Sequence, residues 1–358
     1  MHVLNFFDTY TLMAVVEEIV PQQSFFLDRY FATGDDDIFQ SDKVLMEYQK
    51  GDRRMAPFVS PRAGDIPMDR QGYHISELQP AFIAPSRILT ADDLRKRGFG
   101  EALYPGATKA QRAAKLQLKD MTDMDRRIRR REEWMAAQTM INNACTMQEY
   151  VDDHTKGETL YVKFFDNASE HRYTSNVKWT TWNIMKGDVM AMCRMLTSRG
   201  LPAEDLVLGS EVSAQVLELP GIEEKLNKNS GINIGAINET LTKYDGVVFM
   251  GRLNFGGNIL NVFSVDETYE DENGQTQRYF PETSAMVTAP GCGHMMYGQI
   301  TQIDHGSTEF TDHAGTRVPK FILDQEHDVR KIRLGSRPLA APKNYCPYIY
   351  AANVVEVE

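Results

Sequence analysis

Residues 107–147 read ATKAQRAAKLQLKDMTDMDRRIRRREEWMAAQTMINNACTM, and this stretch constrains the fold more than any other part of the chain. Pro105-Gly106 interrupts whatever precedes it, and Thr108 is suited to cap the start of a helix. One continuous helix of this length spans roughly 60 Å, far beyond the ~11–12 residues of an ordinary helix. We therefore predict a rod that serves as a structural spine. Its apolar side chains recur at helical spacing, at Ala114, Leu118, Met121, Met124, Ile128 and Met135.

The rod carries a dense basic run, Arg126-Arg127-Ile128-Arg129-Arg130-Arg131. Carboxylates three or four residues away along a helix can pair with such arginines. We predict an ion-pair face, either solvated or shared between subunits, with Arg126, Arg127 and Arg130 as intersubunit contacts. Contact with DNA is the alternative. The candidate acidic partners are Asp120, Asp123, Asp125, Glu132 and Glu133.

Residues 38–90 predict an extended hairpin that stands away from the main body. Five of the fifteen prolines fall between residues 55 and 85, and proline does not belong inside a sheet. The glycine-bearing, charged stretch 62–72 is typical of a loop tip. An isolated hairpin is marginally stable in water, so we expect it to pack on a neighbouring subunit. The expected contacts are Phe58, Phe82, Arg62, Asp65, Asp69 and Arg70.

The rest of the chain mixes helices and strands without a regular repeat, which predicts an α+β fold. Residues 159–165 and 171–174 have the pattern of a hairpin, and residues 183–199 of a helix that ends at Gly200. Ser210 is expected to cap a helix that follows a strand at 205–208, and 251–257 to form a surface turn. Further strands are predicted at 246–250, 258–265, 328–334 and 347–357, with a turn at 271–274.

Composition and charge exclude several classes of function. The 358 residues are 42% apolar, enough for one or two cores. The net charge of −11 argues against high-affinity duplex DNA binding, which needs clustered Lys and Arg. No apolar run approaches the ~18 residues of a membrane helix, and the sequence starts without the pattern of a secretion signal. The scattered Cys145, Cys193, Cys292 and Cys346 predict buried, reduced thiols.

Catalytic motifs are weak throughout the sequence. No nucleophile elbow, zinc-protease motif or P-loop occurs. The most enzyme-like stretch is 292–313, but its spacing matches no recognised zinc site. We expect no metal, no cofactor and no enzymatic activity; a metal-dependent hydrolase is the enzyme alternative. That stretch holds Cys292, His294, Asp304, His305, Asp312 and His313.

Four segments in order carry a resemblance to a known family: 55–61 with its return arm 79–85, the Arg-rich helix 109–147, Tyr279-Phe280-Pro281-Glu282-Thr283-Ser284-Ala285-Met286-Val287, and a tail. The tail has Pro319-Lys320, a basic strand to Leu334, then Ser336, Pro338 and a last apolar strand. In this order, from about residue 25 to the end, the chain resembles the lambda-type major capsid protein E family of tailed bacteriophages.

The resemblance implies the tailed-phage capsid fold. It divides the chain into an N-terminal arm (1–37), an extended loop (38–90), a peripheral domain with the spine helix (91–180), an axial domain (181–325) and return strands of the peripheral domain (326–358). It implies an icosahedral head of pentamers and hexamers around double-stranded DNA. A portal, a scaffold and a cementing protein are the implied partners, with weak, non-specific DNA contact and no membrane. The implied location is the virion, assembled in the bacterial cytoplasm. Another virion component, such as a tail or portal subunit, is the remaining alternative.

Overall fold

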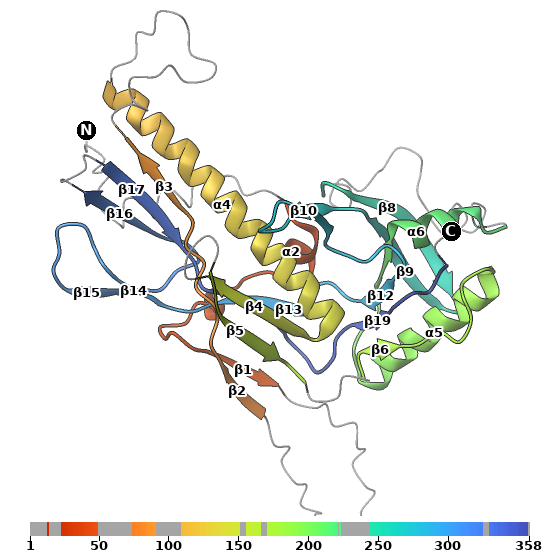
Figure 1. Cartoon of the computed structure of the whole chain (residues 1–358). Helices are drawn as coiled ribbons and strands as arrows, with labels where there is room; N and C mark the ends of the chain where they lie inside the picture. The colour runs from red at the N-terminus through yellow and green to blue at the C-terminus, as the bar shows by residue number, and fades with distance from the viewer. Residues whose placement is uncertain are drawn as a thin grey trace, which may run out of the picture.

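A single long helix organises the molecule. In the computed structural model, α4 (Lys109–Asn142) is 34 residues long and runs diagonally across the structure, with most strands on either side of it (Figure 1). At ~1.5 Å per residue the helix is about 51 Å long. The structure describes residues 13, 23–48, 74–90, 109–150, 155–165, 170–220, 222, 244–324 and 329–356. The predicted rod is confirmed, although Thr108, its expected cap, lies outside the described residues.

The helix ends five residues before the predicted end, and the reason is local. Asn143 adopts a left-handed backbone with φ 53°, a conformation that often follows the last turn of a helix. Its side chain is then held in place, because Nδ2 donates to the Phe165 carbonyl at 3.3 Å and Tyr348 donates to Oδ1 at 3.1 Å. Residues 144–147 therefore belong to a strand instead of the helix.

The first half of α4 packs on a three-stranded sheet. Strands β16 (Val318–Asp324), β17 (Val329–Gly335) and β3 (Ser86–Leu89) lie in that order, all antiparallel. The sheet contributes Phe321, Ile332 and Leu334 to a small core with the helix. Met121, Met124 and Ile128 of the predicted stripe are buried there, whereas Leu118 is 49% exposed. The stripe is thus correct except at its N-terminal end.

A second layer is a mixed six-stranded sheet in the order β6-β19-β12-β7-β9-β8. The β7–β9 and β19–β6 pairs are parallel, and the other pairs are antiparallel. Both faces of this sheet are covered, and the central strand β7 is buried along its whole length, with an apolar run from Leu206 to Leu208. The strands are β6 (Arg172–Tyr173), β7 (Asp205–Gly209), β8 (Val247–Phe255), β9 (Asn258–Val265), β12 (Ala285–Thr288) and β19 (Ile349–Ala351).

Alternate residues of β7 enter different cores. Leu206 and Leu208 pack with helices α5 (Trp182–Ser198) and α6 (Ser210–Glu218). Val207 points the other way, into the larger core that contains the end of α4. The sheet therefore joins the helix-covered part of the molecule, on the right of Figure 1, to the long helix.

The N-terminal aromatic residues are part of the larger core. Helix α2 (Phe25–Tyr30) buries Phe25, Phe26, Leu27 and Tyr30, and Phe25 meets Phe263 of β9 with ring centroids 5.2 Å apart. The 3-10 turn η1 (Asp35–Asp37) follows. Asp37 is buried in this turn, because its carboxylate accepts the Gly34 N–H and pairs with His294.

The remaining strands form antiparallel pairs. The β1–β2 pair is the base of the predicted extended hairpin, whose tip at 62–72 lies outside the described residues. The pairs are β1 (Val44–Tyr48) with β2 (His74–Leu78), β4 (Ala144–Tyr150) with β5 (Lys156–Lys163), β10 (Thr268–Glu270) with β11 (Thr276–Arg278), β13 (Gly293–Tyr297) with β18 (Pro338–Pro342), and β14 (Ile300–Ile303) with β15 (Phe310–His313).

Three local predictions were wrong. The 159–174 hairpin does not form: β5 pairs with β4, and β6 pairs with β19, because tertiary packing overrides a short-range turn signal. Ser210 is the first residue of α6 and Gly209 occupies the cap position. Most of the expected turn at 251–257 is strand β8, and only Gly256 and Gly257, with φ 65° and 107°, turn the chain.

The predicted helix at 183–199, the strands near 246–250 and 258–265, and the turn at 271–274 are confirmed. The expected terminal strand at 347–357 is reduced to three residues. Strand pairing crosses the predicted domain boundaries, since β19 joins β12 while β17 joins β16. Among the described residues, no helix is both long and apolar enough to cross a bilayer.

Candidate assembly site

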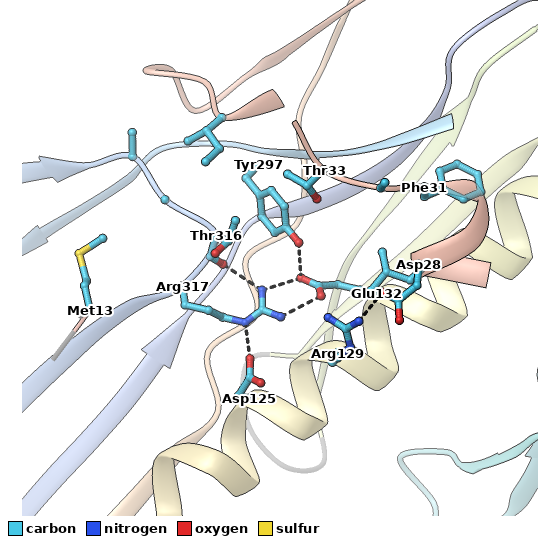
Figure 2. Close-up of a pocket in the computed structure, with 15 residues that line it drawn as sticks. Met13, Asp28, Phe31, Thr33, Asp125, Arg129, Glu132, Tyr297, Thr316 and Arg317 are labelled. Carbon is cyan, nitrogen blue, oxygen red and sulfur yellow. Dashed lines mark hydrogen bonds and ion pairs between the residues drawn. The ribbon is translucent and has the colours of Figure 1, made fainter. Parts of the chain in front are cut away.

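A buried ion-pair junction fastens the long helix to the chain entering β16. Figure 2 shows Arg317 reaching across to α4, where it bonds Glu132 with two nitrogens and Asp125 with Nε. The distances are 2.7 Å (Nη1–Oε1), 2.8 Å (Nη2–Oε2) and 2.7 Å (Nε–Oδ1). Tyr297 of β13 donates its hydroxyl to Glu132 at 3.0 Å. Three segments distant in sequence thus meet at one guanidinium.

The side chains of this junction raise the pKa of both Arg317 and Tyr297. Burial alone lowers the pKa of Arg317, but Glu132, Tyr297 and Asp125 outweigh it and raise that pKa well above the usual value. Burial and the Glu132 charge raise the pKa of Tyr297, which stays a neutral donor. Two carboxylates face one arginine, so a hollow of about 550 Å³ beside the junction has acidic character; Asp28 and Arg129 also line it.

A second junction holds the N-terminal helix against α4. Glu133 is buried, and its two oxygens accept the backbone N–H groups of Phe26 and Leu27, each at 2.7 Å. These groups lie in the first turn of α2, where no N–H has a partner within the helix. Burial and the nearby Glu267 carboxylate raise the pKa of Glu133 to about 8 despite the two hydrogen bonds.

The third junction ties α2 to the six-stranded sheet. Arg29 forms two bonds to Asp205 of β7, from Nε at 2.6 Å and from Nη2 at 2.8 Å. Asp205 is fully buried and also accepts from Tyr30 at 3.1 Å and from Asn261 of β9 at 2.9 Å. A buried carboxylate needs this complete set of partners. Helix α2 is therefore fixed on both sides, to the long helix and to the sheet.

The arginine run of α4 divides between two roles. Arg129 pairs with Asp28 of α2, and Arg131 pairs with Glu272 beyond β10. Arg126, Arg127 and Arg130 are exposed. The expected pairing along the helix is wrong for Asp125, Glu132 and Glu133, which are buried and serve Arg317 and the α2 backbone instead. The missed signal is the burial periodicity: these acids lie on the same side as the apolar stripe.

Arg127 and Arg130 line one wall of a groove of about 900 Å³. The opposite wall is acidic and comes from the chain just before β8 and from the segments around β10 and β11. Glu267 in this wall has its pKa raised to about 7 by burial and by Asp245, an effect that Arg130 opposes. The acidic lining consists of Asp245, Asp266, Glu267, Glu270, Asp271 and Glu272. The groove thus offers a basic and an acidic wall to any segment that enters it.

Of the other predicted contact residues, the structure describes only Phe82. Phe58, Arg62, Asp65, Asp69 and Arg70 lie outside the described residues. Phe82 is described: its ring is 40% exposed, and the Arg333 guanidinium stands 5.3 Å from its centroid.

The Cys/His/Asp stretch at 292–313 does not gather into a site. His294 pairs with Asp37 at 3.1 Å and His313 with Asp304 at 2.9 Å, while His305 meets the Phe321 ring edge to face. In the part of the chain that the structure describes, no group of three or more His, Cys, Asp or Glu is placed to hold a metal. The four cysteines are buried and free, as predicted. The geometry gives no support to a metal hydrolase.

Arg317, Arg29 and Asp205 were not found by sequence reasoning. None of them lies in a recognisable motif, and the partners lie far away in the chain: 185 residues separate Arg317 from Glu132, and 176 separate Arg29 from Asp205. Pairings at such distances have no local signature.

A family model, that of the phage major capsid protein E, matches residues 8–351. The chain belongs to this family. It is therefore a capsid protein, a structural component of the phage virion. A search of curated proteins finds no match.

Solved structures agree with this assignment. A prophage protein from E. coli CFT073, described as a capsid protein, superposes with a TM-score of 0.65 at 15% identity, covering 96% of this chain and 98% of that one. This capsid protein thus has the tailed-phage capsid fold. A phage-related protein from Bordetella bronchiseptica RB50 (TM-score 0.48, 11% identity, 97% of each chain) and a chain of the satellite phage P4 procapsid with its size determination protein (0.45, 12%, 98% of this chain and 100% of that one) are also similar.

Proposed function

We propose that this capsid protein assembles into pentamers and hexamers that close as an icosahedral head around double-stranded DNA. The match of the family model over residues 8–351 is the observation that supports this. Assembly in the reducing bacterial cytoplasm accords with four buried, free cysteines. A portal, a scaffold and a cementing protein are the proposed partners, and no catalytic role is assigned to the chain.

Contact with packaged DNA is proposed to be weak and non-specific. The net charge is −11, and two of the five arginines of the basic run are bound by Asp28 and Glu272. A protein that neutralises few phosphates shows a shallow dependence of affinity on salt.

The groove lined by Arg127 and Arg130 on one wall and by acidic side chains on the other is the proposed receptor for the charged loop tip of a neighbouring copy. The tip sequence carries two basic and two acidic residues, Arg62, Asp65, Asp69 and Arg70. The groove has Arg127 and Arg130 on one wall and acidic side chains on the other, so each sign of charge can meet its opposite. Arg126, Phe58 and Phe82 are proposed to flank this contact.

Negative-stain electron microscopy and sedimentation of the purified full-length chain test the proposal. The expected result is closed, shell-like particles whose capsomers have five and six copies. Rings or tubes would point to a tail or portal role instead. A chain that stays monomeric at every concentration, also when it is co-expressed with the phage's other head proteins, contradicts the proposal.

A further inference from the structure

The β14–β15 hairpin presents an aromatic side chain, Phe310, to solvent. Its register places Ile303 opposite Phe310, and Thr301 opposite Asp312, on one face of the ribbon. The opposite face is buried, with Ile300, Gln302 and His313 each at most 4% exposed. Phe310 is 75% exposed, more than any other large apolar side chain in the described residues. The hairpin projects from the body, at the left of Figure 1.

The hairpin is anchored to its own chain through its inner face and through His305 in its turn, whose ring meets Phe321. Gln302 donates to the Pro319 carbonyl at 3.2 Å and accepts from Arg333 at 3.1 Å, and both partners belong to the β16–β17 sheet. The outer face, with Phe310, consequently points away from that sheet. Aromatic side chains, phenylalanine among them, are enriched in the cores of protein interfaces.

A complementary surface lies on the outer side of the three-stranded sheet. Ile322, Lys331 and Ile88 form one cross-strand row, and Ile88 is 57% exposed. Helix α4 covers the other side, where Phe321 and Ile332 are buried. In the described sheet, β3 pairs only with β17, so its far edge is open.

The two surfaces match in polarity and in charge. Each has an exposed apolar side chain, Phe310 or Ile88, beside charged residues of opposite sign. The hairpin offers Asp312 together with the exposed Glu309, and the sheet offers Lys331. Because the outer face of the hairpin points away from its own sheet, the two surfaces of one chain do not face each other.

We propose that the outer face of the β14–β15 hairpin docks on the Ile322–Lys331–Ile88 row of a second copy of this chain. Phe310 covers Ile88, and Asp312 pairs with Lys331. Two different patches meet, so the contact is heterologous and repeats from copy to copy. The inference rests on the proposed self-assembly, but its contact is separate from that of the charged loop tip.

An engineered disulfide tests the contact directly. The four native cysteines are buried, so a Phe310→Cys/Ile88→Cys variant adds the only exposed thiols among the described residues. A disulfide requires Cβ atoms about 3.5–4.5 Å apart. Mild oxidation of assembled particles should yield a ladder of covalent multimers, and neither single variant should. Particles without a ladder overturn the proposal. Covalent dimers from Phe310→Cys alone overturn it as well, because hairpins would then meet each other.

Substitutions give a second readout. Phe310→Ser should raise the concentration needed for assembly about tenfold or more, as expected for an aromatic anchor. Thr308→Ala, in the exposed turn of the same hairpin and outside its paired strands, is the control and should behave as wild type. Asp312→Lys and Lys331→Asp should each impair assembly, and the double variant should recover it. If the two single variants and the double variant assemble equally well, this pairing is wrong.

The outcomes also separate this inference from the proposed function. A wild-type chain that forms no particles refutes both. Wild-type particles together with Phe310→Ser particles that assemble at the same concentration refute only the hairpin contact.

Discussion

Arg317 and Glu132 form a two-pronged ion pair, with Nη1 2.7 Å from Oε1 and Nη2 2.8 Å from Oε2, across 185 residues of sequence. Both side chains are almost completely buried. The attraction within such a pair is largely offset by the cost of removing both charges from water, whereas the loss of one partner leaves a charge uncompensated. The intact pair therefore adds little net stability, but removing one of its two side chains should lower the free energy of unfolding strongly.

Arg317→Met is expected to lower the free energy of unfolding by about 3–5 kcal/mol, because Glu132 and Asp125 would stay buried without their cation. Urea unfolding of the unassembled subunit measures this loss. Arg126→Met is the matched control, since Arg126 is exposed, and should change stability by no more than about 0.5 kcal/mol. Equal effects of the two substitutions would contradict the role given to the junction.

Glu133→Ala removes the acceptor of two buried N–H groups, those of Phe26 and Leu27. Each unsatisfied donor costs about 1–3 kcal/mol. The subunit should be destabilised accordingly, and amide hydrogen exchange should rise first at these two positions. Glu149→Ala, at an exposed acid on β4, should leave both measurements unchanged. Unaltered exchange at Phe26 and Leu27 in the Glu133 variant would refute this account.

The raised pKa of Glu133 predicts a specific pH dependence. Its folded pKa is about 8 against a usual 4.5, so between these values the folded chain holds a proton that the unfolded chain releases. This contribution to stability is fully present below pH 4.5 and is lost as the pH rises through about 8. Glu133→Gln should flatten the fall in stability across this window.

Glu267 adds a smaller slope of the same sign, because its pKa is raised to about 7. Glu267→Gln alone should therefore flatten the dependence mainly below neutral pH, and the double variant should flatten it further. Unfolding free energies measured from pH 5 to 9 decide the matter. A slope that is unchanged in Glu133→Gln shows that this carboxylate is not the source.

Gly209→Ala tests the close approach between β7 and the segment before β12. A Cβ atom at Gly209 would lie 2.3 Å from the carbonyl oxygens of Pro281 and Glu282. Both obstacles are backbone atoms, so they cannot rotate away, and a cost of about 1–3 kcal/mol is expected. Gly187→Ala on α5 is the control, since nothing lies within 4 Å of its added carbon. Thermal unfolding distinguishes the two.

The long helix could be predicted because its signal is local. Apolar spacing and the preceding Pro105-Gly106 are contained in one stretch, and only the end differed, where Asn143 adopts a left-handed backbone. The 159–174 hairpin failed for the opposite reason. Its turn residues favoured local pairing, but β4 and β19 offered partners that no short window reveals.

The sequence predicted the exposed residues of the site but not its buried ion pairs. Arg126, Arg127 and Arg130 were recognisable as a basic run, and they are exposed in the structure. The acids beside them look like helical pairing partners in the sequence, yet Asp125 and Glu132 point inward to Arg317. Which side of a helix a charge occupies depends on the packing of distant strands.

The final prediction concerns the charged tip at 62–72 and the groove proposed to receive it. Replacing residues 63–71 with a short Gly-Ser turn should leave thermal unfolding of the subunit nearly unchanged, since a projecting hairpin contributes little to a core. Assembly should fail or give irregular particles.

Arg127→Glu/Arg130→Glu, which reverses one wall of the groove, should produce the same defect. One exposed ion pair contributes only ~0–1 kcal/mol, but a closed shell repeats each contact in every copy, so small losses accumulate. Arg194→Glu, a charge reversal at an exposed residue of α5 that lies outside the groove lining, keeps the groove intact and so distinguishes a groove effect from a general effect of charge. If the tip replacement builds normal shells, the tip makes no necessary contact. If it prevents the monomer from folding, residues 63–71 belong to the core, and the extended-loop interpretation is wrong.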